Sequence, residues 1–87
     1  MSDELDDYSA VADEQLDELE VADRELYNAV LTVCALIFQD PRRAQSMSTS
    51  VSTADGIVLR LAVPGCHPYK VFWTSEGPRI EAVFPHP

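Results

Sequence analysis

The clearest alternation of apolar and polar side chains lies in residues 57–63, which read IVLRLAV. Successive side chains of a β-strand point to opposite faces, so Arg60 lies on the face opposite to its two neighbours. The other face carries only apolar side chains: Ile57, Leu59, Leu61 and Val63. This pattern predicts a strand that is buried on one face and open on the other.

The sequence on either side of this stretch predicts further strands. Residues 47–53 are rich in Ser and Thr, and residues 54–56, Ala-Asp-Gly, have the composition of a hairpin turn. Residues 69–74 and 79–84 carry aromatic and branched side chains on either side of a turn. Connections this short join antiparallel neighbours, so we expect a three- to four-stranded antiparallel sheet within residues 46–84.

The first half of the chain has a helical period instead. Residues 8–40 are expected to be helical, and the clearest apolar stripe is formed by Leu26, Val30, Cys34, Ile37 and Phe38. We predict two helices with a break near residues 20–22, because one helix of this length would be unusual in so small a domain. A single bent helix also fits the pattern. Pro41 is expected to end the second helix, which runs from about residue 23 to residue 39.

Together these segments predict an α+β fold of one domain spanning residues 1–87. Two N-terminal helices pack on the apolar face of the antiparallel sheet, as layered domains require. Residues 1–7 are acidic and are expected to fray.

Charge is distributed unevenly along the chain. Residues 1–25 contain eleven acidic residues and one basic residue, whereas residues 26–87 contain four acidic and five basic residues. A pI near 4.3 argues against strong non-specific binding of nucleic acid. The acidic start has no signal-peptide pattern and no stretch is long enough to span a bilayer, so we expect a cytoplasmic protein with no membrane partner. The spacing of the two cysteines and two histidines is not that of a zinc site, and no cofactor is expected.

Four short segments resemble the RelE/ParE toxin superfamily, in an order that covers roughly residues 8–86. They are YSAVADEQLDEL at residues 8–19, LIFQDP at 36–41, YKVFW at 69–73 and IEAVF at 80–84. The resemblance implies a toxin of a toxin–antitoxin pair, which inhibits translation by cleaving mRNA or inhibits replication through gyrase. It further implies a cognate antitoxin as partner, the ribosome with its mRNA or gyrase as target, and, for the RNA-cleaving branch, an endoribonuclease that needs no metal.

The chain departs from the family pattern in two respects. The family begins with a strand, and no clear strand precedes the first predicted helix here. Its RNA-cleaving members carry many basic residues on the sheet, whereas this sheet offers only Arg60, Lys70 and Arg79.

Three residues are the candidate catalytic set. Arg60 and Lys70 lie on neighbouring predicted strands and on the open face, where they would hold a phosphate and offset charge that develops during RNA cleavage. His86 would act as general acid or base, since imidazole titrates near neutral pH. The structural alternative is that both cations are solvated, or paired with Glu81, and that His86 lies in an inert tail.

Other residues have a chemical and a structural interpretation. Cys66 beside His67 suggests an activated thiol, but sequence neighbours rarely have the required geometry. Tyr69 and Trp73 would stack on bases, or would simply belong to the core.

A second function remains open from the residues alone. The acidic first 25 residues and the exposed sheet edge left by a missing first strand also fit a non-catalytic binding module. Such a module would dock a basic protein, or form a homodimer through its sheet edge.

Overall fold

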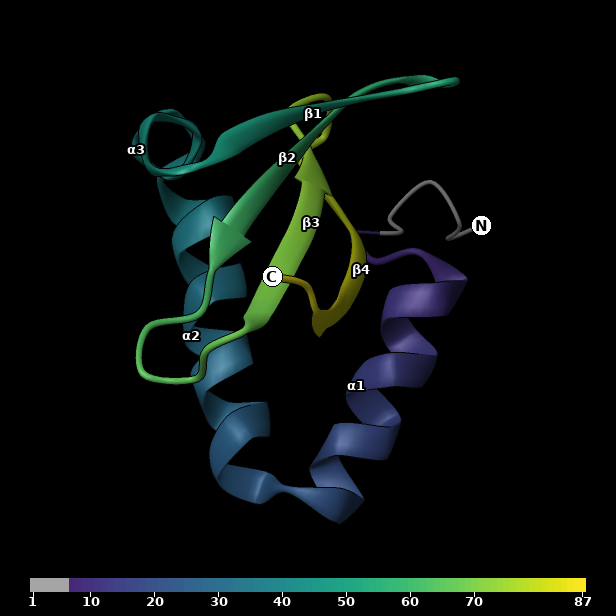
Figure 1. Ribbon diagram of the computed structural model, residues 1–87, viewed down its shortest axis with the longest axis vertical. Coiled ribbons are helices and arrows are strands. Elements are labelled where there is room, and N and C mark those ends of the chain that lie inside the picture. The colour runs from purple at the N-terminus through teal and green to yellow at the C-terminus, as the bar shows by residue number, and fades with distance from the viewer. Residues whose placement is uncertain (1–6) are drawn as a thin grey trace.

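The computed structural model describes residues 7–87 and shows an α+β fold in which three helices precede a four-stranded antiparallel sheet (Figure 1). The helices are α1 (Ala10–Ala22), α2 (Arg24–Gln39) and α3 (Pro41–Met47). The strands are β1 (Thr49–Thr53), β2 (Gly56–Ala62), β3 (Tyr69–Thr74) and β4 (Arg79–Pro85). Within residues 7–87, no helix combines the length and the apolar character that crossing a bilayer requires.

The predicted break between the first two helices is confirmed, and it is made by a cap. Asp23 has non-helical backbone angles (φ −154°, ψ 88°), and its side chain accepts a hydrogen bond from the N–H of Leu26 at 3.2 Å. An aspartate in this position satisfies one of the N–H groups that the first turn of a helix leaves free. A single acidic residue therefore separates α1 from α2 without Gly or Pro.

The prediction that Pro41 ends the second helix is confirmed, because α2 stops at Gln39, but a third helix that was not predicted follows directly. Pro41 is the first residue of α3, and the Asp40 side chain caps this helix by accepting a hydrogen bond from the N–H of Arg43 at 3.2 Å. Proline is excluded from a helix interior but is favoured at the first position, where its missing N–H has no helical partner. The same residue therefore closes α2 and opens α3, and the first strand begins at Thr49 instead of residue 47.

The sheet is a meander with the order β1-β2-β3-β4, as the short connections predicted. Arg60 on β2 lies opposite Phe72 on β3, and Lys70 on β3 lies opposite Phe84 on β4. The β3–β4 register shifts beside Phe72, so one extra residue of β4 bulges at this point.

The segment before α1 pairs with the outer edge of β4. Tyr8 forms an isolated parallel bridge with Ile80, and the N–H of Ser9 donates to the Ile80 carbonyl at 2.9 Å. The N–H of Ile80 donates to the Asp7 carbonyl at 2.8 Å, so Asp7 is held against β4 instead of being frayed. Residues 1–6 of the segment expected to fray lie outside the described residues.

Side chains of α1 and of its N-cap residue Ser9 cover the next part of the β4 edge. The Ser9 hydroxyl donates to the Glu81 carbonyl, and the Gln15 Oε1 accepts from the N–H of Val83 at 2.6 Å. These bonds satisfy edge groups that would otherwise be open to another chain.

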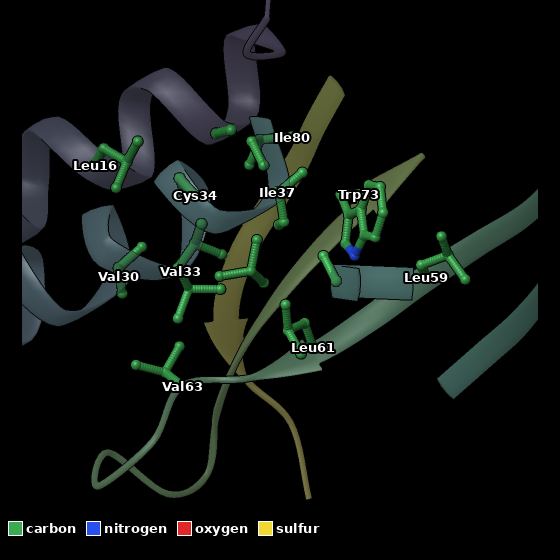
Figure 2. Close-up of a cluster of buried hydrophobic side chains, with 14 of the residues drawn as sticks. Leu16, Val30, Val33, Cys34, Ile37, Leu59, Leu61, Val63, Trp73 and Ile80 are labelled. Atoms are coloured by element: carbon green, nitrogen blue, oxygen red, sulfur yellow. The ribbon is translucent and has the colours of Figure 1, made fainter. Parts of the chain in front are cut away.

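The core lies between the helices and one face of the sheet (Figure 2). Trp73, Ile37, Ile80, Val30, Val71 and Cys34 are its largest fully buried side chains. The alternation in β2 is confirmed at Leu59 and Leu61, which are buried, but Ile57 on the same face is 63% exposed. The helices do not reach the turn end of the β1–β2 hairpin (Figure 1). The alternation of apolar and polar residues therefore predicted a buried side chain at a position that no helix covers.

Two ionisable groups pack together inside the helical layer. Cys34 is 1% exposed, and burial raises the pKa of its thiol to about 11. Burial, with smaller effects of the neighbouring Cys34 thiol and the carboxylates of Asp7 and Asp13, raises the pKa of Tyr8 to about 12. The Tyr8 ring also meets the Phe38 ring edge to face, with centroids 5.6 Å apart.

These shifts predict a loss of stability at alkaline pH. In the unfolded chain Cys34 and Tyr8 lose their protons at their ordinary pKa values of 9 and 10, before the folded protein does. The contribution of these two groups to the free energy of unfolding is therefore complete below about pH 9 and is lost as the pH rises towards 12. For Cys34 alone, the free energy of unfolding should fall by about 3 kcal/mol. Urea unfolding between pH 8 and pH 11 measures it, and Cys34→Ala should flatten the pH dependence. An equal slope in both proteins would contradict this prediction.

Candidate functional site

The three residues predicted as a catalytic set meet on the face of the sheet that points away from the helices. Arg60 lies on β2 and Lys70 on β3, and both alternate with side chains that enter the core. His86 directly follows β4, whose last residues pair with the start of β3. Three segments that are separated by ten to sixteen residues in sequence are therefore brought to one place by the strand register.

Arg60 is oriented by two hydrogen bonds. Its Nε donates to the Thr49 hydroxyl on β1 at 3.1 Å, and its Nη1 lies 3.0 Å from the Nδ1 of His86. A guanidinium has no acceptor, so it donates in both bonds and the Nδ1 of His86 accepts. This bond occupies the lone pair on the Nδ1 of His86. The remaining N–H groups of Arg60 are available to an anion.

Lys70 is attached to the same tail through main-chain oxygens. Its Nζ donates to the carbonyl of His86 at 2.9 Å and to the carbonyl of Pro68 at 3.2 Å. An ammonium group has three donors, so one is left for a ligand. Neutral carbonyl partners leave the positive charge of Lys70 uncompensated.

His86 does not lie in a loose tail. Its N–H donates to the Pro68 carbonyl at 2.8 Å, which extends the pairing of β3 with β4 by one step. Its ring packs edge-on against Phe72 (centroids 5.4 Å apart) and Phe84 (6.0 Å). The imidazole is thus held by its backbone, by Arg60 and by two aromatic rings.

Two aromatic residues of this face do not belong to the predicted catalytic set. Phe72 and Phe84 stack in parallel, with ring centroids 4.6 Å apart and an interplanar angle of 7°. Tyr69 and Trp73, which were considered for base stacking, lie on the other face, and Trp73 is fully buried with its Nε1 donating to the Ser48 hydroxyl at 3.1 Å. The alternation of side chains along β3 already places Phe72 on this face, since Phe72 is two residues from Lys70.

Acidic side chains do not neutralise these cations within residues 7–87. Glu81, which was considered as their partner, lies instead 3.8 Å from the Nη1 of Arg79 and accepts a hydrogen bond from the Thr74 hydroxyl at 3.2 Å. The open face therefore keeps the positive charge of Arg60 and Lys70 next to an imidazole, although the chain as a whole is acidic.

The Cys66–His67 pair lies in the loop between β2 and β3, away from this face. Cys66 is half-buried at a shallow pocket beside Asp23 and Leu26. Among the described residues, no hydrogen bond joins its thiol to His67, and no third side chain orients the imidazole. The part of the chain that the structure describes also contains no group of three side chains able to hold a metal ion.

Comparison with protein-family models, curated proteins and solved structures gives no match to this chain. The relationship to the RelE/ParE superfamily stays a prediction, and the function has to be argued from the site itself.

Proposed function

We propose that this protein is a toxin-like endoribonuclease of the RelE/ParE type, which inhibits translation by cleaving mRNA without a metal ion. The observation that carries the proposal is the convergence of Arg60, Lys70 and His86 beside a stacked pair of phenylalanines. This set combines two cations for a phosphate, an imidazole for proton transfer and aromatic rings beside them.

Binding of an RNA phosphate would rearrange the hydrogen bonds of the site. A phosphate oxygen is a stronger acceptor for a guanidinium than a neutral imidazole is, because the bond is charge-assisted on both sides. Arg60 would therefore exchange the Nδ1 of His86 for the phosphate, and Lys70 would use its free donor. This exchange leaves the Nδ1 lone pair of His86 able to accept a proton.

The chemical step then needs only the RNA and these side chains. The 2′-hydroxyl oxygen attacks the adjacent phosphorus and loses its proton to His86, while the bond from phosphorus to the 5′-oxygen of the next nucleotide breaks. The products are a 2′,3′-cyclic phosphate and a 5′-hydroxyl, and the leaving 5′-oxygen takes up a proton from the imidazolium or from water. Arg60 and Lys70 stabilise the negative charge that builds up on the phosphate oxygens.

The charge distribution suggests where such an enzyme would find its substrate. Two cations on a chain of net charge −9 give weak affinity for free RNA. An mRNA that is already held in an extended form, as on a translating ribosome, would meet this small site without a large electrostatic contribution. The weak affinity expected for free RNA thus favours mRNA on the ribosome as the substrate.

Tightly regulated expression in a bacterial host tests the proposal. We expect rapid growth arrest together with cleaved transcripts whose new 5′ ends are hydroxyls, measured by colony counts and by mapping of RNA ends. Arrest with intact transcripts would contradict RNA cleavage and point to gyrase or another protein target. Continued growth with soluble, folded protein would contradict a toxin altogether.

The second candidate is a binding module that docks a basic protein, and α1 is the observation in its favour. This helix exposes Asp13, Glu14, Asp17, Glu18 and Glu20, and within residues 7–87 none of them forms an ion pair. A complex through this surface would weaken steeply with salt. Salt-sensitive retention of a basic protein, with no arrest on expression, would favour this candidate.

A further inference from the structure

The outer edge of β1 has no pairing partner among the described residues. β1 is the edge strand of the order β1-β2-β3-β4, and its residues are exposed except for Val51, which is half-buried. Thr53 and Gly56 close a two-residue turn, so the alternation of an antiparallel ladder points the backbone groups of Ser50 and Ser52 away from β2. Among the described residues, no other backbone group pairs with these two.

This edge also lacks the features that normally prevent pairing with another chain. Sheet edges are usually protected by a charged side chain, a proline, a bulge or a covering segment. Residues 49–53 read TSVST and contain neither charge nor proline, and the pairing of β1 with β2 is regular. The opposite edge, in contrast, is covered by the segment before α1 and by the Gln15 side chain.

The sequence of β1 is a palindrome centred on Val51. If two copies pair antiparallel about this residue, Val51 faces Val51, Ser50 faces Ser52 and Thr49 faces Thr53 of the second copy. Every cross-strand pair then joins identical side chains, and Thr–Thr and apolar pairs of this kind are favourable. The two outward-facing serines supply their backbone hydrogen bonds to each other in the same register. The edge is therefore complementary to itself.

The distribution of charge and of exposed apolar side chains is compatible with a second copy of the chain as the partner. The acidic helix α1 packs on β4, which is the far edge of the sheet from β1 (Figure 1), so the acids of the two copies stay apart. At physiological salt, repulsion over such a distance is largely screened. Of the large apolar side chains that are exposed, two lie near this edge: Met47 stands two residues before the start of β1, and Ile57 lies opposite Ser52.

We propose that the protein forms a two-fold symmetric homodimer in which the β1 strands of two copies pair antiparallel about Val51 and make one eight-stranded sheet. Such a contact is isologous, because each copy uses the same surface. The open faces of both sheets point to the same side, so the two Arg60–Lys70–His86 sites lie on one continuous surface. The contact is small, and we expect a dissociation constant on the order of 10–100 μM.

The register makes the test specific. In Ser50→Lys/Ser52→Lys, an introduced lysine at position 50 meets one at position 52 of the second copy, and the like charges should abolish the dimer. In Ser50→Lys/Ser52→Glu, the same positions bring opposite charges together twice, and the dimer should be retained or strengthened. Val11→Lys/Val21→Lys adds the same number of lysines as the first variant at two exposed positions of α1, away from the edge, and should behave like the wild type.

Sedimentation velocity over concentrations below and above the expected dissociation constant distinguishes these species. Circular dichroism checks that each variant is folded. Amide hydrogen exchange of the wild-type protein provides a measurement without mutation, because the Ser50 and Ser52 amides should exchange more slowly at high concentration. A monomer at every concentration would overturn the proposal. A dimer that persists in the double-lysine variant, or one lost equally in the lysine–glutamate variant, would overturn it as well.

Discussion

RNA cleavage should be lost when Arg60 and Lys70 are both replaced by alanine. Removing one preorganised donor to a developing negative charge typically costs on the order of 10²–10³ in rate, and this variant removes both cations of the site. We expect at least a 10³-fold lower rate of cleavage of a single-stranded RNA, measured by release of 5′-hydroxyl ends from purified protein. Growth arrest on expression should disappear with it.

The control for this variant must change the charge equally. Arg42→Ala/Arg43→Ala also removes two positive charges, but from α3, which lies away from the open face. This control should keep nearly the full cleavage rate. Equal losses in both variants would mean that only net charge matters, and unchanged cleavage in the Arg60/Lys70 variant would remove the proposed site.

The same experiment separates binding from proton transfer. In His86→Ala the backbone carbonyl that holds Lys70 is kept, and so is the guanidinium of Arg60. We therefore expect RNA binding to persist while the cleavage rate falls by about 10²–10⁴, the usual contribution of a general acid or base. All three variants change partly exposed side chains on the sheet face or on α3, so their unfolding midpoints should stay close to that of the wild type.

The largest loss of stability is expected for Trp73→Ala. Trp73 is fully buried between the helices and the sheet, and its indole N–H is bonded to the Ser48 hydroxyl. Deleting the ring removes a large apolar area, leaves a cavity and frees a partly buried hydroxyl, which together cost about 3–5 kcal/mol. A domain of this size has only about 5–10 kcal/mol in total, so the variant should lose at least about a third of its stability.

Two further variants make this prediction quantitative. Trp73→Phe keeps an aromatic ring but loses the N–H donor, and it should cost clearly less than the alanine variant. Val21→Ala changes a residue that is 90% exposed, so it should stay within about 0.5 kcal/mol of the wild type. Urea unfolding followed by far-UV circular dichroism measures all three proteins. A loss below about 1 kcal/mol in Trp73→Ala would mean that this residue is not the centre of the core.

Several features of the fold could be predicted from local sequence because local physics determines them. The stripe through Val30, Cys34 and Ile37 required a helix with one buried face, and the alternation at Leu59 and Leu61 required a strand with one buried face. Short turns then left an antiparallel meander as the topology. The third helix was missed because Asp40-Pro41 both ends one helix and starts the next. The sequence analysis used only the first of these two signals.

The candidate site could be predicted only in part. The alternation of side chains along each strand placed Arg60 and Lys70 on the open face, since side-chain direction in a strand follows from position alone. This alternation could not show that His86 lies beside Arg60 and Lys70. The position of His86 depends on how far β4 pairs with β3 and on its hydrogen bond to the Pro68 carbonyl. Nor did the alternation show that Glu81 turns to Arg79, since a bulge beside Phe72 alters the alternation in β4.

The sequence by itself thus determined the α+β class, the order of the elements, which strand faces are apolar, and the separation of an acidic first segment from a nearly neutral sheet. These properties depend on residue type and on spacings of a few residues. Only the tertiary structure decided which segments meet: Asp7–Ser9 with β4, and His86 with Arg60 and Lys70. It also decided that the outer edge of β1 has no partner within residues 7–87. Such contacts depend on register and on bulges summed over whole strands, where a shift of one residue reverses every side chain.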